Sequence, residues 1–128
     1  LGAVEGANTY MSILKGTGTF DLVLLGLGED GHTASLFPGH NLGNEAGAPD
    51  VLAVNDAPKP PSERISLSAN RLSQARQVWF LVTGETKRSA IKKWQLEKMI
   101  PAESICPTDG VDIYTDLELE GMSQELGS

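Results

Sequence analysis

Residues 20–28 have the sequence FDLVLLGLG, an apolar run that ends in glycines. A short apolar run bounded in this way is typical of a strand buried on both faces in a parallel sheet. Residues 78–83, VWFLVT, form a second run of the same kind, followed by Gly84. Such strands, alternating with helices, predict an α/β fold with a largely parallel sheet flanked by helices. In such sheets ligands bind beyond the carboxyl ends of the strands.

Hydrophobic spacing, together with capping and breaking residues, predicts shorter elements on either side of these strands. Prolines in APKPP, residues 57–61, keep that segment extended or turning. Pro38 and Gly39 limit any helix after the first strand to a turn or two. The expected helices cover residues 1–15, 68–75 (capped by Ser68) and 86–99, and the expected short strands cover 51–54, 64–67 and 111–114. The expected core residues include Val4, Tyr10, Met11 and Leu14 of the first helix, and Trp79, Phe80 and Trp94.

Composition limits the classes of protein to consider. The chain has 128 residues, 40% of them hydrophobic, which is enough for one domain or part of one. Its net charge of −7 disfavours nucleic acid as a partner. No apolar run is long enough to cross a membrane and no secretion signal precedes the first helix, so we expect a soluble, cytoplasmic protein. A single cysteine and two histidines provide neither a disulfide nor the spacing of a metal site.

The basic residues are unevenly distributed. Residues 59–98 contain nine of the ten lysines and arginines but only three acidic residues, whereas the segments before and after are acidic. This basic block has two interpretations of equal weight. It is either the solvated face of a helix or the place where an anionic small molecule binds.

The segment after the first strand has the spacing G-x-G-x-x-G, from Gly26 through Gly28 to Gly31. This spacing formally matches the dinucleotide-binding fingerprint. We reject a dinucleotide cofactor because the fingerprint needs a full helix beginning within it, and Pro38 leaves no room for one. The glycines would still allow the backbone to approach a ligand closely.

Asp30 and His32 place a carboxylate and an imidazole two residues apart in this segment. An imidazole can take a proton from water near neutral pH, and a nearby carboxylate can orient it. The alternative is that Asp30 only caps the short helix and His32 is an ordinary loop residue. The residues alone leave both interpretations open. Ser35 is a poor nucleophile candidate because we expect it inside that helix rather than on a sharp elbow.

Two basic residues are candidates for binding an anion. Lys87 is expected in the first turn of a helix, where a cation is unfavourable unless an anion binds beside the free N–H groups. It could instead pair with Glu85 or point into water. Arg64 follows two prolines, which would fix the direction of a guanidinium suited to phosphate or carboxylate, but it could equally pair with Glu63 or Asp56.

Residues 20–40, FDLVLLGLGEDGHTASLFPGH, closely resemble the signature of the 6-phosphogluconolactonases, within the superfamily of glucosamine-6-phosphate isomerases. KPPSERISL at 59–67 and VTGETKR at 82–88 resemble later segments of that family, in the same order. The resemblance implies a Rossmann-like α/β domain. It also implies hydrolysis of 6-phospho-D-glucono-1,5-lactone to 6-phosphogluconate, in the oxidative pentose phosphate pathway, without a metal or cofactor.

The resemblance also implies residue roles. His32 would be the general base that activates water, and Asp30 would orient it. Gly26, Gly28 and Gly31 would line the sugar, while Lys87 and Arg64 would hold the phosphate. The deaminases of the superfamily resemble this segment too, but they have a carboxylate five positions after the histidine, where this chain has Phe37.

The chain departs from the family in length. Family members usually exceed 200 residues, and their amino-terminal half supplies early strands, a phosphate loop and a further arginine. Residues 1–116 therefore resemble the carboxyl-terminal half of such a domain, an incomplete one, and residues 117–128 form an acidic tail expected to fray. We expect the missing half to be required for activity. The alternative is a noncatalytic fragment that only binds sugar phosphates or associates through its sheet edge.

Overall fold

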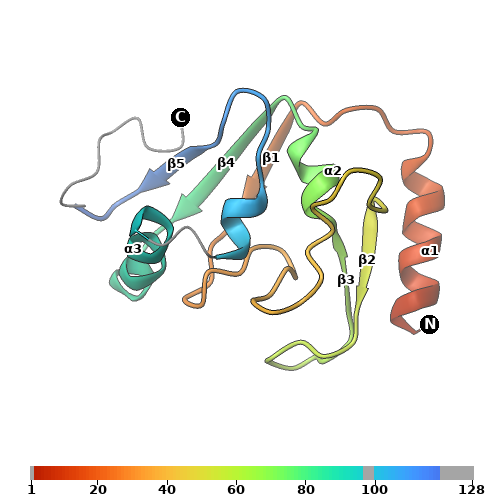
Figure 1. The fold of residues 1–128 in the computed structure, drawn as a ribbon, viewed down its shortest axis with the longest axis horizontal. Helices are drawn as coiled ribbons and strands as arrows, with labels where there is room; N and C mark the ends of the chain where they lie inside the picture. Colours follow the sequence, from red (N-terminus) through yellow and green to blue (C-terminus); the bar gives the residue numbers. More distant parts are fainter. Residues whose placement is uncertain (1, 97–99, 119–128) are drawn as a thin grey trace.

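The computed structural model describes residues 2–96 and 100–118 (Figure 1). The elements in chain order are α1 (Ala3–Leu14), β1 (Leu22–Leu25), β2 (Val51–Val54), β3 (Arg64–Leu67), α2 (Ala69–Ser73), β4 (Gln77–Val82), the 3₁₀ turn η1 (Glu85–Lys87), α3 (Arg88–Leu96), the 3₁₀ turn η2 (Pro101–Ser104) and β5 (Asp112–Thr115). The turn η2 is the one described element that the sequence did not predict.

The strands form two separate sheets. The larger one has the order β1-β4-β5 and is parallel throughout, with Leu25 opposite Phe80 and Phe80 opposite Ile113. The expected α/β fold with a parallel sheet is therefore confirmed. Strands β2 and β3 instead pair antiparallel with each other, Val54 opposite Arg64, because the proline-containing segment between them reverses the chain.

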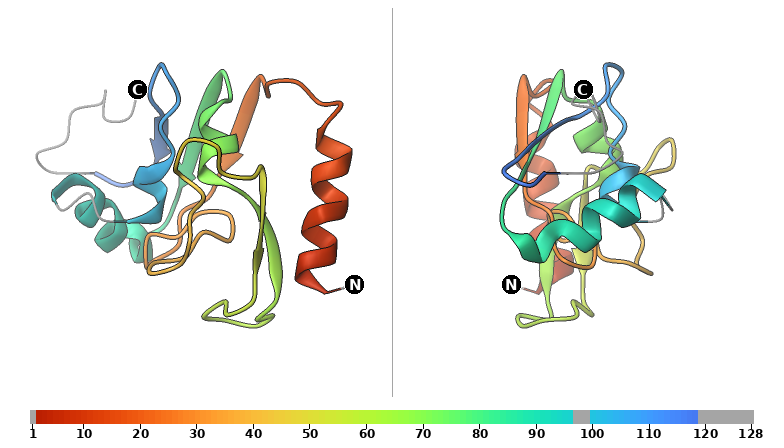
Figure 2. Two further views of the ribbon diagram at one scale, coloured as in Figure 1. Left: turned by 45° about the vertical axis from the view of Figure 1, so that its right-hand side comes forward. Right: turned by 90° about the vertical axis from the view of Figure 1, so that its left-hand side faces the viewer.

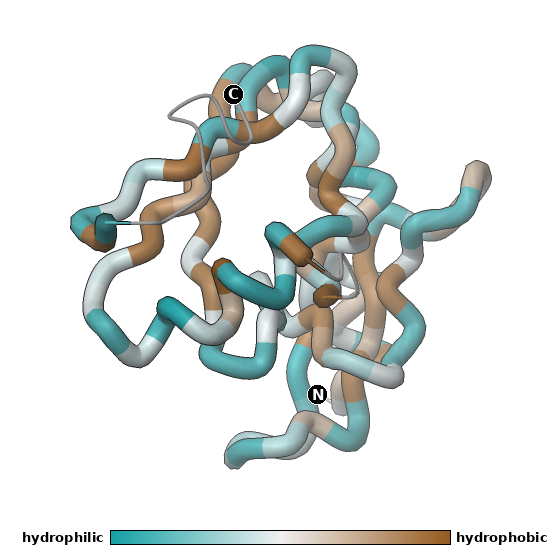
Figure 3. Tube along the Cα trace, turned by 60° about the vertical axis from the view of Figure 1, so that its left-hand side comes forward, coloured by the Kyte–Doolittle hydropathy of each residue, from teal (hydrophilic) through white to brown (hydrophobic). Residues whose placement is uncertain are grey.

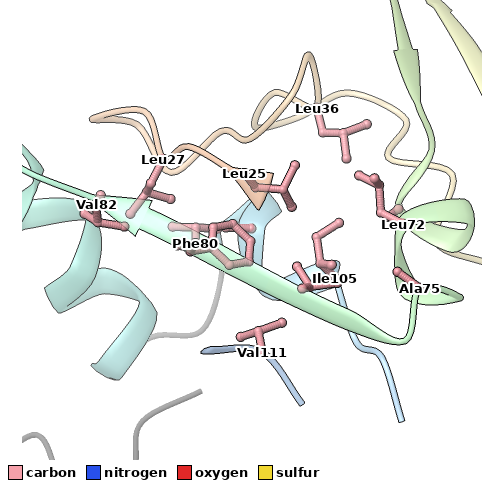
Figure 4. Close-up of a cluster of buried hydrophobic side chains, with 14 of the residues drawn as sticks. Leu25, Leu27, Leu36, Leu72, Ala75, Phe80, Val82, Ile105 and Val111 are labelled. Atoms are coloured by element: carbon pink, nitrogen blue, oxygen red, sulfur yellow. The ribbon is translucent and has the colours of Figure 1, made fainter. Parts of the chain in front are cut away.

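One face of the parallel sheet packs against helices. Figure 4 shows Phe80 among buried side chains from β1, α2 and the segment after η2, and the right-hand view of Figure 2 places α3 and η2 on the same side of β1 and β4. Trp94 of α3 stands edge-on to Phe80, with ring centroids 4.9 Å apart. The core predictions for Phe80 and Trp94 are confirmed, since Phe80 is fully buried and Trp94 packs against the core.

The opposite face of the sheet is open to solvent among the described residues, so the prediction that β1 and β4 are buried on both faces is wrong. Side chains alternate along a strand, and one set of alternate residues lies on the uncovered face. Trp79 lies there as well and is only partly buried, with its ring 5.2 Å from that of Tyr114. The exposed residues on this face are Leu22 (41%), Leu24 (56%), Leu81 (48%) and Tyr114 (50%). Figure 3 shows the hydropathy along the chain, with apolar and polar residues interspersed.

Helix α1 packs against β2 and β3 rather than against the parallel sheet. It buries Ala3, Ala7 and Leu14, whereas Val4 is exposed, so the predicted apolar stripe is wrong at Val4. The small residues let the helix lie close to the strands. A Cβ atom at Gly6 would already be 3.5 Å from the Ile65 side chain.

The side chain of Arg71, in α2, contacts the segment before β1 and the segment before β2, and so connects the two sheets. Its Nη2 donates to the carbonyl oxygens of Thr17, at 3.3 Å, and Gly18, at 2.9 Å, just before β1. Nη1 is 3.4 Å from Asp50, which precedes β2, and the guanidinium lies 4.7 Å from the centre of the Phe20 ring. Ser68 caps α2 as predicted, because its Oγ accepts the backbone N–H of Arg71.

Two further predictions differ from the structure in detail. The helix expected over residues 86–99 is divided into η1 and α3, and residues 97–99 lie outside the described part. Most of the acidic tail, residues 119–128, also lies outside it. Within the described residues, no helix is both long and apolar enough to cross a membrane.

Candidate active site

The segment after β1 is a series of turns. Gly28 donates its N–H to the carbonyl of His32, at 2.8 Å, and Gly31 has a φ of 89°, a conformation that suits glycine. No residue between 26 and 40 is helical, so the short helix in which we placed Ser35 does not form. Ala34 instead has a φ of 51°. The absence of a helix here agrees with rejection of the dinucleotide fingerprint.

Contacts from distant parts of the chain hold these turns in place. Thr33 is buried, and its hydroxyl donates to the carbonyl of Gly26, at 2.7 Å. The N–H of Ser35 donates to Ser66 Oγ of β3, at 3.2 Å. The carbonyl of Gly31 accepts from Ala102 of η2, at 3.1 Å. The position of His32 therefore depends on both sheets and on η2.

Asp30 and His32 form a close pair. Asp30 Oδ1 is 2.6 Å from His32 Nδ1 and accepts the backbone N–H of His32 at 3.0 Å. The carboxylate therefore holds both the backbone of the turn and the ring of His32. No helix forms directly after Asp30, so it does not act as the helix cap that the alternative interpretation expected. When the ring is neutral and Nδ1 donates to the carboxylate, the lone pair is on Nε2, as a general base requires.

The pair also determines the charge of Asp30. Partial burial favours the neutral carboxyl group, but the hydrogen bonds from the backbone and ring of His32, with the charge of the ring, outweigh it. The pKa of Asp30 is therefore lowered. A lowered pKa favours the ionised carboxylate, the form that accepts hydrogen bonds from the imidazole and from the backbone.

Gly28 leaves the space in which the imidazole lies. A Cβ atom at this position would collide with Nδ1 and Cε1 of the His32 ring. A Cβ at Gly31 would collide with the Ile100 side chain, whereas one at Gly26 would meet no atom within 4 Å. Of the three glycines expected to line a substrate, Gly28 is the one at which a side chain would collide with His32.

A cavity of about 170 Å³ opens beside the pair. One wall comes from the segment after β1 and the other from the segment between β2 and β3. The Phe37 ring is buried 4.8 Å from the imidazole, and His40 stands edge-on to it at 5.8 Å. The lining residues are Glu29, Asp30, His32, Phe37, Pro58 and Lys59.

Arg64 approaches this cavity from β3 but binds backbone carbonyls. Its Nε donates to Pro61, at 3.0 Å, and its Nη2 donates to Lys59, at 2.9 Å. The guanidinium lies 5.2 Å from the centre of the Phe37 ring. It forms no ion pair with Glu63 or Asp56, the two acidic partners that the sequence suggested.

Lys87 lies in η1, after β4. Because β1 and β4 are adjacent and parallel, η1 and the segment containing His32 leave the sheet at the same edge. Glu85 pairs with Arg88 rather than with Lys87, at 2.8 Å through both carboxylate oxygens. The hydrogen bonds from Arg88 lower the pKa of Glu85. Lys87 does not line the cavity beside His32.

Sequence reasoning missed three of the lining residues. Glu29 and Pro58 had no assigned role, and Lys59 was noted only as part of the basic block and of the segment that includes Arg64. The proline-rich context of Lys59 was the one signal that could have identified it. Within the described residues, no group of three or more His, Cys, Asp or Glu side chains could hold a metal ion.

The fold and the site together define an α/β protein with a carboxylate–histidine pair at the carboxyl edge of its parallel sheet. The profile of the family described as glucosamine-6-phosphate isomerases/6-phosphogluconolactonase matches residues 2–114. The chain belongs to this family.

Similar proteins include a human 6-phosphogluconolactonase, 44% identical over 94 residues, or 71% of this chain and 36% of the relative. A chloroplastic 6-phosphogluconolactonase of Arabidopsis thaliana is 47% identical over 100 residues, covering 76% of this chain and 30% of the relative. Among solved structures, the Thermotoga maritima 6-phosphogluconolactonase superposes with a TM-score of 0.77 at 26% identity, covering 90% of this chain and 51% of that one.

The enzyme from Trypanosoma brucei gives a TM-score of 0.73 at 29% identity, covering 88% and 51% of the two chains. A monomeric glucosamine-6-phosphate deaminase, at 17% identity and a TM-score of 0.61, shares the fold. The chain thus spans about a third of the length of the curated relatives and about half of the solved chains that it matches.

Proposed function

We propose that this chain carries the acid–base site of a 6-phosphogluconolactonase, which hydrolyses 6-phospho-D-glucono-1,5-lactone to 6-phosphogluconate in the pentose phosphate pathway. The observation that supports this most directly is the Asp30–His32 pair, with Nδ1 held at 2.6 Å, beside an open cavity. The names of the relatives point to the same reaction. A cytoplasmic location is part of the proposal.

In the proposed reaction, His32 Nε2 takes a proton from water as the water oxygen bonds to the lactone carbonyl carbon. The tetrahedral intermediate then expels the ring oxygen, and the imidazolium returns the proton to it. The product is the open-chain acid, which ionises to the carboxylate. Asp30 holds the imidazole in the required tautomer. A positioned general base contributes roughly 10²- to 10⁴-fold.

Substrate binding would use the same edge of the sheet. Gly26, Gly28 and Gly31 would lie along the sugar, where the lack of side chains permits close approach. Lys87 would contact the phosphate as one of its cations. Arg64 was expected to be a second, but its Nε and Nη2 already donate to carbonyls.

The alternative activity is that of a glucosamine-6-phosphate deaminase. The resemblance implies that the deaminases need a carboxylate five positions after the histidine to open the sugar ring. In this chain Phe37 occupies that position, buried against the imidazole. A phenyl ring cannot transfer a proton, so we expect no release of ammonia from glucosamine 6-phosphate.

The remaining length of the relatives enters the proposal as a partner. We propose that an amino-terminal half of the same protein covers the face of the parallel sheet that exposes Leu24 and Leu81. The competing hypothesis is that the chain is a noncatalytic fragment that only binds sugar phosphate.

The test is lactone hydrolysis above the spontaneous rate, measured with the chain alone and with the chain joined to the amino-terminal half of a relative. We expect His32→Asn to lower the catalysed rate by at least about 10²-fold, because no group then takes the proton from water. His40→Asn is the matched control, since His40 contacts Phe37 but not Asp30.

The outcomes separate the hypotheses. Activity in the joined protein only would identify the chain as an incomplete catalytic part. Absence of activity in both forms, or full activity of the His32→Asn variant, would overturn the proposed function.

A further inference from the structure

Lys59 is the one permanently cationic residue among the described residues that line the cavity beside His32. Its side chain is exposed and forms no hydrogen bond or ion pair within the described part of the chain. It belongs to the wall between β2 and β3, whereas His32 belongs to the wall after β1. A ligand that fills the cavity would therefore meet an imidazole on one wall and an ammonium group on the other.

Arg64 fixes the backbone of Lys59. Its Nη2 donates to the carbonyl oxygen of Lys59 itself, at 2.9 Å, and lies 3.5 Å from that of Pro60. Nε donates to Pro61 at 3.0 Å, so the guanidinium binds three successive residues of this segment. Charge-assisted hydrogen bonds of this kind hold a loop more firmly than neutral ones.

The same guanidinium also touches the other wall. It lies over the Phe37 ring, at 5.2 Å, and that ring lies 4.8 Å from the imidazole of His32. Phe37 is 2% exposed and so cannot shift without disturbing the core. Arg64 therefore contacts both walls of the cavity, the backbone of Lys59 on one and the ring that lies beside His32 on the other.

From these contacts we infer that Lys59 is the cation of this cavity that binds the phosphate of the ligand, and that Arg64 is a positioning residue that holds Lys59 at a set distance from His32. An ammonium group on a flexible stem suits a phosphate because it acts as a point charge with three donors. The inference rests on the proposed function, because it assigns the phosphate of the same substrate. It changes the role expected of Arg64 from direct contact to support.

The test uses the chain as it exists and inorganic phosphate as the probe, at constant ionic strength. Backbone and ring resonances of Lys59, Phe37 and His32 are followed by NMR as phosphate replaces chloride. We expect saturable shifts in the wild-type chain and an affinity about tenfold weaker in Lys59→Gln, which keeps the stem but loses the charge. Lys59→Arg should restore most of the binding, and Lys92→Gln, on the exposed surface of α3, should bind as the wild type does.

The role of Arg64 is tested in the same titration. Arg64→Gln should weaken phosphate binding about as much as Lys59→Gln, and it should also shift the Phe37 and His32 ring resonances in the absence of phosphate, because the guanidinium has left the ring. Lys59→Gln should leave those ring resonances unchanged. The double variant should bind no more weakly than Arg64→Gln, since both changes act on one contact.

Three results would overturn the inference. One is the absence of any phosphate-dependent shift in the wild-type chain. Another is unchanged phosphate affinity in Lys59→Gln, which together with a loss in Arg64→Gln would make Arg64 the direct contact. The third is unchanged affinity in Arg64→Gln. None of these measurements requires turnover, so a failure of the proposed hydrolysis would show separately, as phosphate binding without lactone hydrolysis.

Discussion

Gly28 determines where the imidazole of His32 can lie, because a side chain at this position would occupy the space of the ring. We expect Gly28→Ala to leave the chain folded but to lower any catalysed lactone hydrolysis about 10²-fold, because a new methyl group displaces the ring from its productive position. The displaced ring also loses its bond to Asp30. The pKa of Asp30 should therefore rise toward its ordinary value, as measured by NMR of the side-chain carboxyl carbon.

The Asp30–His32 pair also makes the stability of the fold depend on pH. A carboxyl group whose pKa is lowered on folding stabilises the fold above its ordinary pKa, and this contribution is lost as the pH falls through the lowered value. Gly28→Ala should remove that contribution. Gly16→Ala is the matched control, since a Cβ there meets nothing within 4 Å. An unchanged Asp30 titration in Gly28→Ala would contradict the steric argument.

The residues of the site differ in how far the sequence could predict them. Asp30 and His32 are two positions apart, so local geometry alone allowed their contact to be anticipated. Lys59 lies 27 positions after His32, and its place on the opposite wall depends on how β2 and β3 pair. The contact of Arg64 with backbone carbonyls was not predictable either, because sequence shows side-chain partners and not the direction of a loop's carbonyl groups.

At the scale of the elements, Arg71 connects α2 to the segment before β1 and to the segment before β2. Its side chain is 10% exposed and binds Thr17, Gly18 and Asp50. We expect Arg71→Met to lower the free energy of unfolding by about 2 to 3 kcal/mol, because two carbonyls and a carboxylate lose a charged donor. Urea unfolding followed by circular dichroism measures this.

Arg76→Met is the comparison for that experiment. Arg76 also pairs with an aspartate, Asp21 at 3.5 Å, but the two side chains are 74% and 85% exposed. An exposed ion pair contributes about 0 to 1 kcal/mol. Equal losses in the two variants would show that the connection through Arg71 is not what holds the two sheets together.

The helices and strands were predicted well from the sequence, but which of their faces are buried was not. Apolar runs and proline breaks identified each strand within the described residues, because those signals are local. The burial of β1 on both faces was predicted from its continuous apolar run. This prediction is wrong at Leu22 and Leu24 because burial depends on what lies over the sheet. The predicted burial of Val4 was wrong for a related reason, since α1 approaches β2 and β3 through its small residues.

For the molecule as a whole, the uncovered face of the parallel sheet has the largest consequence. We expect Leu24→Lys with Leu81→Lys to reduce self-association of the isolated chain, measured by sedimentation at increasing concentration, because exposed apolar side chains drive association. The same pair should prevent the amino-terminal half of a relative from binding. Gln77→Lys, an exposed position on the same face, is the control for added charge alone. If the double variant still bound that half as the wild type does, the two parts would have to meet at another surface of the chain.

The two tryptophans lie on opposite sides of β4. Trp94 stands against Phe80 in the core, whereas Trp79 lies beside Tyr114 on the uncovered face, with its indole Nε1 buried and without a hydrogen-bond partner among the described residues. The chain therefore contains two tryptophan fluorophores that report on different faces of the sheet. Emission from Trp94 reports whether the helices are packed on the sheet, and emission from Trp79 reports what covers its other side. With either one replaced by phenylalanine, ordinary fluorescence can follow folding and assembly as two distinct events in a single polypeptide.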